Sequence, residues 1–466
     1  MELTVYRDFP EDPLPAGILA RTEGEVAFRY HEDYLASPAA APLSLSLPLQ
    51  AEPYTEEELT PYFRGLLPEG AALENLCRSL GIPQDDYIAM LAACGLDCLG
   101  DVIIDPAVYT ETRSYEAVSL DQIKEMAGKP GKIDESLEMA RLSLAGTQNK
   151  CGLFHDPAAP ITEGWYQPVG GAPSNYIVKF AREDLIDLMQ VEHLSMTCAA
   201  ACGLDVARTA LISPLKPIIC VERYDRRLAS NETINGLPAP LRRHQEDLTQ
   251  AFGLLPHAKY RELKPSSVQV IADFLRRRSA QPARDLRAFA SLILFNYLIG
   301  NCDNHLKNLS ILYAPDWQSF ILAPAYDLVS TTYFARFSRE MGMAIGEHTD
   351  IEEVTTADFA ILADQLGISM RVLRNIVDTF AEKALPSLRE EGTQLASEGY
   401  DAAPYIADDI EEDIDTQQPI ERGKLYRTWS KTFLLRKIIS RKRFPRKSFA
   451  LGSRRFFPFG WGGYRS

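Results

Sequence analysis

The sequence predicts an α+β protein with two lobes, the first rich in strands and the second all-helical. Short runs of β-branched and aromatic residues recur over residues 140–230, whereas residues 243–390 carry apolar residues at helical spacing. Within the helical half, residues 298–313 place an Asp, a His, a Lys and an Asn inside six positions between two apolar runs. A chain of 466 residues is long enough for roughly two to four domains around a large core.

Residues 1–104 are predicted to form a separate mixed α/β subdomain. Its β-like runs are residues 3–6, 26–30 and 43–49, the last alternating strictly until Pro48 stops it. An apolar helix is expected after residue 69, ending at Gly81. Residues 105–138 are polar and glycine-containing, so we expect a linker there.

The first lobe is predicted over residues 139–242 and the second over residues 243–400. In the first lobe we expect two strands joined by a small-residue turn within residues 142–153, strands at 176–180 and 218–224, and a helix at 191–202. In the second lobe we expect a long helix at 285–299 and a helical pair around Gly367 within 359–388.

The polar stretch in the helical half has the spacing that phosphoryl transfer uses. Asp303 and Asn308 stand five residues apart, as do the catalytic Asp and the metal-binding Asn of protein kinases, and Asp327 follows another apolar run. Asp303 would accept the proton of the acceptor hydroxyl, while Asn308 and Asp327 would hold Mg²⁺, and neither carboxylate needs an unusual pKa. The alternative is a polar loop that caps two helices.

Basic residues near this stretch are candidates for contacting phosphates. Lys179 lies in a predicted strand, like the phosphate-pairing lysine of kinases, although a strand lysine commonly faces solvent. Lys307 is an alternative for neutralising the transferred phosphate, and His305 is expected to orient the loop. The sequence lacks both common glycine-rich nucleotide loops, and residues 145–150 (AGTQNK) are the nearest substitute.

With these residues assembled, the chain resembles the HipA family, the serine/threonine kinase toxins of bacterial type II toxin–antitoxin modules. The resemblance covers roughly residues 1–385. The matching segments are residues 43–49, 63–70, 142–150, 173–180, 221–226, 244–253, 299–308 and 324–330. They follow one another in the same order as in the family.

The resemblance implies a bilobal, protein-kinase-like fold with an extra N-terminal subdomain. It makes Asp303 the catalytic base, Asn308 and Asp327 the Mg²⁺ ligands, and residues 222–224 the hinge that holds adenine. The set that it implies for ATP binding is Ala145, Gly146, Thr147, Gln148, Asn149, Lys150, Lys179, Glu222, Arg223, Tyr224, His305, Leu306, Lys307, Asn308, Tyr326 and Asp327.

Regulation and partners are also implied by the resemblance. Ser143 occupies the place of the family's autophosphorylated Ser, whose modification expels the phosphate loop, and an ordinary strand serine is the alternative. The expected partners are a HipB-like helix-turn-helix antitoxin, operator DNA through that antitoxin, and a protein substrate of translation such as an aminoacyl-tRNA synthetase. A catalytically silent corepressor and a small-molecule kinase are the competing functions.

The composition favours a globular cytoplasmic protein. No apolar run approaches the roughly 20 residues that span a bilayer, and the N-terminus lacks a signal-peptide pattern. Eight cysteines form no C-x-x-C pair, and buried thiols in a reducing compartment fit them better than metal ligands.

The C-terminal end differs sharply in charge from the rest of the chain. Residues 422–466 hold 14 of the 49 Lys and Arg residues and no Asp or Glu, whereas the whole chain has a net charge of −15. Aromatic residues between the basic ones would suit a nucleic-acid or membrane surface. We favour the alternatives, namely a disordered tail at 421–466 or an extension from an altered reading frame.

Overall fold

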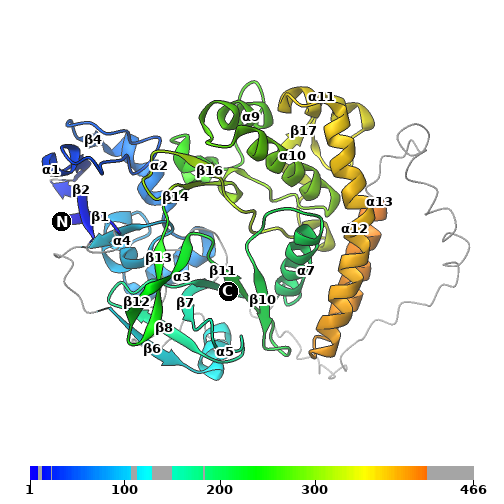
Figure 1. The fold of residues 1–466 in the computed structure, drawn as a ribbon, viewed down its shortest axis with the longest axis horizontal. Coiled ribbons are helices and arrows are strands. Elements are labelled where there is room, and N and C mark those ends of the chain that lie inside the picture. The colour runs from blue at the N-terminus through cyan, green and yellow to red at the C-terminus, as the bar shows by residue number, and fades with distance from the viewer. Residues whose placement is uncertain (9–12, 23, 106–112, 129–149, 182–183, 417–466) are drawn as a thin grey trace, which may run out of the picture. The chain divides into compact units, whose positions relative to one another are not determined.

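The computed structural model describes residues 1–8, 13–22, 24–105, 113–128, 150–181 and 184–416, drawn as coloured ribbon in Figure 1. Three regions follow one another along this part of the chain: an N-terminal subdomain, a lobe built on a six-stranded sheet, and a larger, mostly helical lobe. No helix among the described residues is both long enough and apolar enough to cross a bilayer.

The N-terminal subdomain is an antiparallel sheet covered by helices. Its strands, in spatial order, are β4 (Tyr54–Thr55), β3 (Glu25–Tyr30), β2 (Leu14–Thr22), β1 (Glu2–Arg7) and β5 (Val102–Asp105). Its helices are α1 (Glu32–Leu35), α2 (Glu56–Gly65), α3 (Gly70–Leu80), α4 (Tyr87–Cys94) and the 3-10 turn η1 (Gly95–Asp97). The predictions for residues 3–6 and 26–30 and for the helix ending at Gly81 are confirmed. Gly81 is the left-handed C-cap of α3, with φ 67°.

Residues 43–49 do not form the strand that their alternation predicts. They contain a single isolated bridge, between Ser44 and Leu47. The backbone of this segment forms hydrogen bonds with the buried hydroxyl of Tyr30 and not with a neighbouring strand. That hydroxyl accepts from the Leu43 N–H and donates to the Leu47 carbonyl. The alternation therefore reflects a segment folded over a tyrosine, not a sheet.

The first lobe is a six-stranded sheet with a helix packed on it. Its strands, in spatial order, are β10 (Thr209–Ile212), β11 (Ile218–Glu222), β9 (Tyr176–Phe180), β7 (Lys150–His155), β8 (Trp165–Val169) and β6 (Ser114–Val118). Helix α7 (Leu188–Ala201) is buried along most of its length, and the hairpin of β12 (Arg226–Ile234) and β13 (Leu237–Arg242) follows the sheet. The strands predicted around residues 176–180 and 218–224 and the helix at 191–202 are confirmed.

The predicted linker, residues 105–138, is corrected by this sheet. Strand β6 pairs with β8, and α5 (Leu120–Gly128) follows it. Val118 and Ile123 are buried in the same apolar cluster as Trp165. An edge strand and an amphipathic helix contain many polar residues, so their composition resembles that of a linker.

The second lobe is mostly helical but also contains two small sheets, so its prediction as all-helical is wrong. Its helices are α8 (Leu248–Ala251), α9 (Ser267–Arg278), α10 (Pro282–Leu298), α11 (Thr356–Leu366), α12 (Met370–Ser397) and α13 (Ala403–Thr416), with 3-10 turns η2 (Pro256–Ala258), η3 (Leu306–Asn308) and η4 (Thr331–Tyr333). One sheet has the order β14 (Gln245–Asp247), β15 (Ser310–Tyr313), β16 (Phe320–Leu322); the other pairs β17 (Glu340–Ile345) with β18 (His348–Asp350). The helical pair around Gly367 is confirmed, with Gly367 as the left-handed C-cap of α11.

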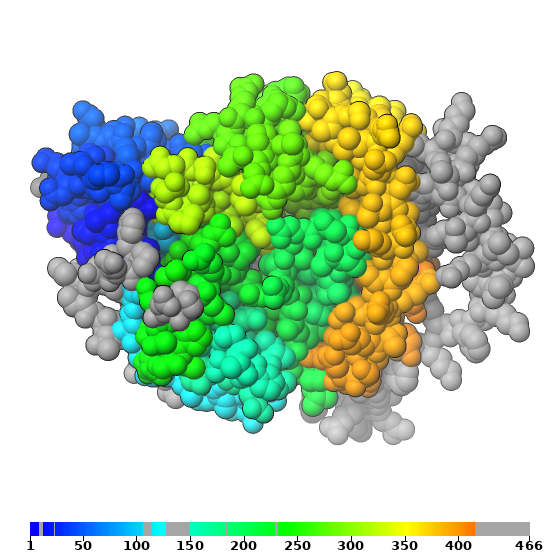
Figure 2. Space-filling model, viewed as in Figure 1, coloured from blue at the N-terminus to red at the C-terminus, as the bar shows by residue number. Residues whose placement is uncertain are grey.

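The N-terminal subdomain packs directly on the second lobe. Figure 2 shows the blue N-terminal residues against the yellow-green segment of that lobe. The guanidinium of Arg7 lies 3.6 Å from the ring centroid of Trp317, and the hydroxyl of Ser44 donates to Glu246. One apolar core runs through both regions, while the outer face of the first lobe has its own cluster. All eight cysteine side chains are buried.

Candidate active site

A cavity lies where the six-stranded sheet, the N-terminal subdomain and the second lobe meet. Its empty volume, open mouth included, is about 1010 Å³. The predicted site residues that line it are Lys150, Lys179, Glu222, Arg223, Tyr224, Asp303, His305, Lys307, Asn308, Tyr326 and Asp327. Lys150 of β7 and Lys179 of β9 therefore line the same cavity as the catalytic-loop candidates Asp303 and Asn308.

Some predicted residues cannot be placed on this cavity. Ser143 and residues 145–149, the expected phosphate loop, lie outside the described residues, as does the basic segment 421–466. Leu306 is described but is buried in the core and does not line the cavity. Its backbone N–H donates to the carbonyl of Lys259, 3.2 Å away.

Lys179 is held at the cavity wall by two carboxylates. Its ammonium lies 2.6 Å from Glu192 of α7 and 2.7 Å from Asp327, which follows β16. Burial alone would lower the pKa of Lys179, but the charges of Asp327 and Glu192 raise it well above its usual range. Strand, helix and second-lobe loop are thus joined through one charged lysine.

Asp327 is tuned to remain charged. Burial would raise its pKa, but the ammonium groups of Lys179 and Lys150 outweigh burial and hold the pKa of Asp327 far below its usual range. Its backbone has φ 57°, a left-handed conformation that costs a non-glycine residue energy. Such backbone strain is common at functional sites, and in this chain it is shared by Ser213, Asn235 and Trp317.

Asp303 and Asn308 are fixed to each other by the backbone of their loop. The amide Nδ2 of Asn308 donates to the carbonyl of Asp303 at 2.8 Å, which leaves the amide oxygen for a ligand. The backbone N–H of Asp303 donates to Asn301, and its carboxylate accepts from the hydroxyl of Tyr260. The carboxylate is 52% exposed at the cavity.

The pKa of Asp303 is raised above its usual value. The cavity walls withdraw water from its carboxylate and raise its pKa, the hydroxyl of Tyr260 lowers it, and the charge of Asp327 raises it. A raised pKa makes a carboxylate a better proton acceptor. The shift favours the role of base more than that of metal ligand.

His305 and Lys307 are less available to a ligand than their positions in the sequence indicate. Burial lowers the pKa of His305 to about 4, so its ring is neutral near pH 7. The ammonium of Lys307 already lies 2.7 Å from Asp247 and 3.6 Å from Glu69. Lys307 therefore balances two protein carboxylates at the cavity wall.

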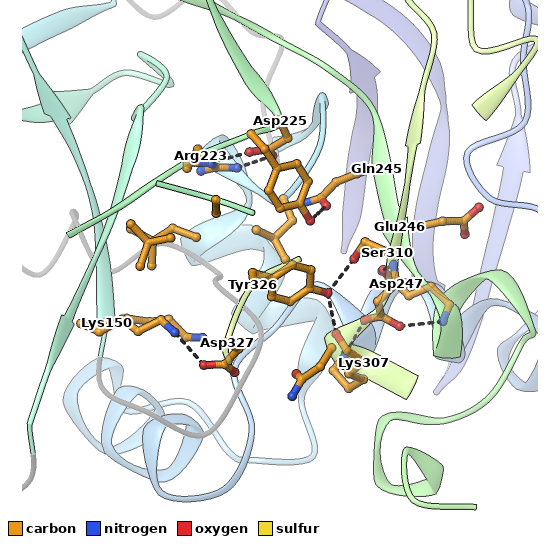
Figure 3. Close-up of a pocket in the computed structure, with 18 of the residues that line it drawn as sticks. Lys150, Arg223, Asp225, Gln245, Glu246, Asp247, Lys307, Ser310, Tyr326 and Asp327 are labelled. Atoms are coloured by element: carbon orange, nitrogen blue, oxygen red, sulfur yellow. Dashed lines mark hydrogen bonds and ion pairs between the residues drawn. The ribbon is translucent and has the colours of Figure 1, made fainter. Parts of the chain in front are cut away.

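One end of the cavity is apolar and aromatic. The rings of Tyr224 and Tyr326 stack with centroids 5.8 Å apart. Figure 3 shows the hydroxyl of Tyr326 between Ser310 and Lys307; it donates to the Lys307 carbonyl at 2.7 Å. The apolar lining residues are Leu99, Ile177, Ala207 and Val221. This end suits a flat aromatic ligand such as a nucleobase.

The hinge candidate Arg223 lines the cavity, but its guanidinium is already fully paired. It donates to Asp225, Asp97 and Ser174 inside the protein. Asp97 also pairs with Arg226 and Arg242, so a carboxylate of the N-terminal subdomain lies behind the hinge. The backbone of Arg223 is also paired, because its N–H donates to the carbonyl of Asn175 and its carbonyl accepts from the N–H of Arg226.

Several lining residues were not predicted from the sequence. Glu69 and Lys259 line the cavity, and Glu192 and Tyr260 contact predicted residues at its edge. The signal for Glu192 was its place on a helix directly after the strand of Lys179, because kinases pair a strand lysine with a helix glutamate. No local pattern marks Glu69 or Tyr260, since each reaches the site through contacts distant in sequence.

The described residues contain no group of three or more His, Cys, Asp or Glu side chains placed to hold a metal ion. Mg²⁺, however, commonly binds through one or two carboxylates together with substrate phosphates. Charged Asp327 and the amide oxygen of Asn308 are hard oxygen donors on the cavity wall. The donor set therefore fits a magnesium–nucleotide complex.

Comparison with known proteins identifies the family. A model of the HipA-like C-terminal domain matches residues 142–388, and a model of the HipA N-terminal domain matches residues 12–105. The protein Y4mE of Sinorhizobium fredii is 32% identical over 80% of this chain and 89% of its own length. The chain belongs to the HipA family. The kinase class and the α+β kinase-like fold predicted from the sequence follow with that membership.

Two further relatives of this HipA-family chain come from Shewanella oneidensis. The serine/threonine-protein kinase toxin HipA is 29% identical over 83% of this chain and 88% of its own length. The solved complex of HipA, HipB and operator DNA contains a chain with a TM-score of 0.67 and 24% identity, covering 89% of this chain and 99% of that one. That structural likeness establishes the fold.

Proposed function

We propose that this HipA-family kinase is an ATP- and Mg²⁺-dependent protein serine/threonine kinase that acts in the cytoplasm as the toxin of a type II toxin–antitoxin module. The observation that carries the proposal is the meeting of Asp303, Asn308 and Asp327 with the Lys179–Glu192 pair on one cavity. These are the positioning and charge-neutralising groups that phosphoryl transfer needs.

The protein's own residues divide the work between two sides of the cavity. Asp303, half exposed and with a raised pKa, accepts the proton of the acceptor hydroxyl. Lys179, fixed by Glu192, contacts the phosphates of the nucleotide. Asp327 and the amide oxygen of Asn308 would hold Mg²⁺, which when bound neutralises charge on the transferred phosphoryl group.

The nucleotide base fits the apolar end of the same cavity. Tyr224 and Tyr326 offer stacked rings, and Val221 and Ile177 supply apolar walls. The guanidinium and the backbone N–H of Arg223 are paired inside the protein, and the N–H of Glu222 donates to Arg208. Within residues 222–224, the backbone of Tyr224 and the carbonyl of Glu222 would therefore recognise adenine. The base at this end and the phosphates near Lys179 together give ATP one orientation.

The partners of the toxin belong to the same proposal. The likeness to a HipA chain solved with HipB and operator DNA supports a helix-turn-helix antitoxin, with operator DNA bound through it. A protein of translation, such as an aminoacyl-tRNA synthetase, is the proposed class of substrate. A silent corepressor is the second function, but the charged and strained state of Asp327 favours a working kinase.

The decisive experiment compares Asp303→Ala with the wild type. The variant should lose transfer of labelled phosphate to proteins of a cytosolic extract by a factor of about 10² to 10⁴ and should no longer arrest growth. Its affinity for ATP should stay close to the wild-type value, because Asp327 and Lys179 are intact. Growth arrest that persists in Asp303→Ala would refute the kinase mechanism and leave the corepressor.

The remaining assignments stay predictions. Autophosphorylation at Ser143 and phosphate binding by residues 145–149 concern residues outside the described part of the chain. Ser143→Ala is expected to abolish self-inactivation, measured as loss of transfer activity after preincubation with ATP. Strand β6 and helix α5 extend the first lobe back to residue 114, which replaces its predicted start at 139. The boundaries after residues 104 and 242 remain proposals. Limited proteolysis would test them.

A further inference from the structure

Among the described residues, Tyr260 supplies the one side-chain hydrogen bond to the carboxylate of Asp303. Tyr260 donates its hydroxyl to Oδ1 of Asp303. The nearest nitrogen of His305 lies 3.9 Å from the same oxygen, beyond hydrogen-bond distance. Because this carboxylate is 52% exposed, packing alone does not fix its side-chain rotamer.

Tyr260 is itself held against the catalytic loop by two further contacts. Its ring packs edge-on against the ring of His305, with centroids 4.9 Å apart and planes at 77°. The carbonyl of the preceding residue, Lys259, accepts from the backbone N–H of Leu306. The hydroxyl, the ring and the neighbouring backbone thus contact Asp303, His305 and Leu306 respectively.

The segment carrying Tyr260 is also braced from the N-terminal subdomain. The ammonium of Lys259 lies 3.3 Å from Glu69, the N-cap residue of α3, and 5.5 Å from the ring centroid of Tyr260. Glu69 also pairs with Lys307 of the catalytic loop at 3.6 Å. One carboxylate therefore ties the Tyr260 segment and the catalytic loop to the same subdomain.

We propose that Tyr260 is the positioning residue of the catalytic base: its hydroxyl fixes Oδ1 of Asp303 and leaves Oδ2 to the acceptor hydroxyl. This inference rests on the proposed kinase function. A base must lie within hydrogen-bond reach of the proton that it accepts, and small losses of alignment lower the rate steeply. A half-exposed carboxylate needs an external contact to hold that alignment.

The same contact has a competing interpretation with the opposite consequence. A hydroxyl that donates to the base also resembles a bound acceptor, so Tyr260 could block the acceptor position. Removing a blocking hydroxyl would lower the acceptor concentration needed for half-maximal transfer. Removing a positioning hydroxyl would lower the maximal rate instead. Kinetics with varied acceptor therefore separate the two.

Tyr260→Phe is the test variant because it keeps the ring on His305 and removes only the hydroxyl. Initial rates of transfer from labelled Mg-ATP to cytosolic extract proteins are measured while ATP and extract are varied separately. We expect the saturated rate to fall roughly tenfold to a hundredfold, the worth of one hydrogen bond to a charged group. The half-saturating ATP concentration should not change.

Controls separate positioning from a general loss of structure. Tyr405→Phe removes the hydroxyl of another exposed tyrosine, on α13, and should leave the saturated rate unchanged. In an Asp303→Asn background, Tyr260→Phe should add no further loss. An unchanged saturated rate in Tyr260→Phe, a lower half-saturating extract concentration, or full additivity with Asp303→Asn overturns the positioning role.

The failure of this inference can be told from the failure of the proposed function. Wild-type protein that transfers phosphate, together with an inactive Asp303→Ala, supports the kinase mechanism whatever Tyr260→Phe does. Wild-type protein that transfers no phosphate overturns both. The side chains of Tyr260 and Asp303 are both about half exposed, so we expect Tyr260→Phe to unfold at the same temperature as the wild type. Equal unfolding temperatures would show that a lower transfer rate comes from the site and not from a loss of stability.

Discussion

Asp303 and Asp327 are two of the acidic residues that line the cavity, and their surroundings differ. Asp327 lies beside the ammonium of Lys179 at 2.7 Å and has a lowered pKa. Asp303 contacts a tyrosine hydroxyl, is half exposed, and has a raised pKa. Identical carboxylates thus receive opposite electrostatic surroundings within one site.

This difference fits the two roles that we propose for these residues. A carboxylate that must hold a cation gains from neighbours that keep it charged. A carboxylate that must take a proton gains from a pKa nearer the working pH. Burial would raise the pKa of both acids, but Lys179 and Lys150 outweigh it at Asp327. At Asp303, burial and the charge of Asp327 outweigh the opposing hydrogen bond from Tyr260.

The largest expected effect comes from neutralising Asp327. Asp327→Asn should lower phosphate transfer by about a thousandfold and should also weaken binding of Mg-ATP, because a negatively charged oxygen donor is lost. Asp303→Asn should lower transfer while leaving nucleotide affinity close to wild type. Equilibrium binding of a fluorescent ATP analogue with and without Mg²⁺ measures the contrast. Equal nucleotide affinities in the two variants would break the comparison.

A smaller effect separates the two buried lysines. Lys179 and Lys307 each pair with two carboxylates, so replacing either with Met leaves buried acids without a counter-charge. Each substitution should lower the free energy of unfolding by about 3 kcal/mol. Only Lys179→Met should also abolish ATP binding, because the ammonium of Lys307 is already neutralised by Asp247 and Glu69.

Denaturant unfolding and nucleotide titration on the same samples check this pair of variants. Loss of ATP affinity in Lys307→Met at a temperature where it remains folded would show that Lys307 contacts the nucleotide. That outcome would support its sequence-based assignment to phosphate and would make the two lysines equivalent.

The smallest effect comes from a third acid, Asp358, which does not line the cavity. Burial would raise its pKa, but hydrogen bonds from Thr355 and the Glu347 N–H lower the pKa of Asp358 to about 2. A pKa below that of the unfolded chain means that its ionised form stabilises the fold above about pH 4. That contribution is lost as the pH falls towards 2.

Asp358→Asn should therefore lower the free energy of unfolding by about 1 kcal/mol at pH 7, a typical value for a helix cap. The difference from wild type should shrink below pH 4, and phosphate transfer at pH 7 should not change. Thermal unfolding at several pH values measures it. A loss of phosphate transfer in Asp358→Asn would show that Asp358 contributes to activity as well as to stability.

The sequence could predict the parts of the site that follow from short-range spacing. Asp303 and Asn308 share one loop, and their five-residue interval is visible without a structure. Lys179 lies in β9, whose bounds match the predicted strand at 176–180. Such features depend on local pattern, and the structure brings all three residues to one cavity.

The contacts that adjust the site could not be predicted, because each joins residues far apart in sequence. Glu69 meets Lys307 from 238 positions away, and Tyr260 meets Asp303 across 43. Patterns also failed where a single contact outweighed periodicity, as where Tyr30 takes the backbone of residues 43–47. Composition misled at residues 114–128, where a polar stretch still contributes an edge strand.

The N-terminal subdomain contacts both lobes beside the cavity, and these contacts restrain movement of one lobe relative to the other. On the first lobe, Asp97 pairs with Arg223 and accepts a hydrogen bond from Ser174. On the second lobe, Glu69 pairs with Lys307 and Ser44 donates to Glu246. Because the subdomain is bound to both lobes, we expect it to restrain their rotation relative to each other. Because these ion pairs are largely buried, added salt screens them weakly. Raising the ionic strength should therefore not by itself release the subdomain from either lobe.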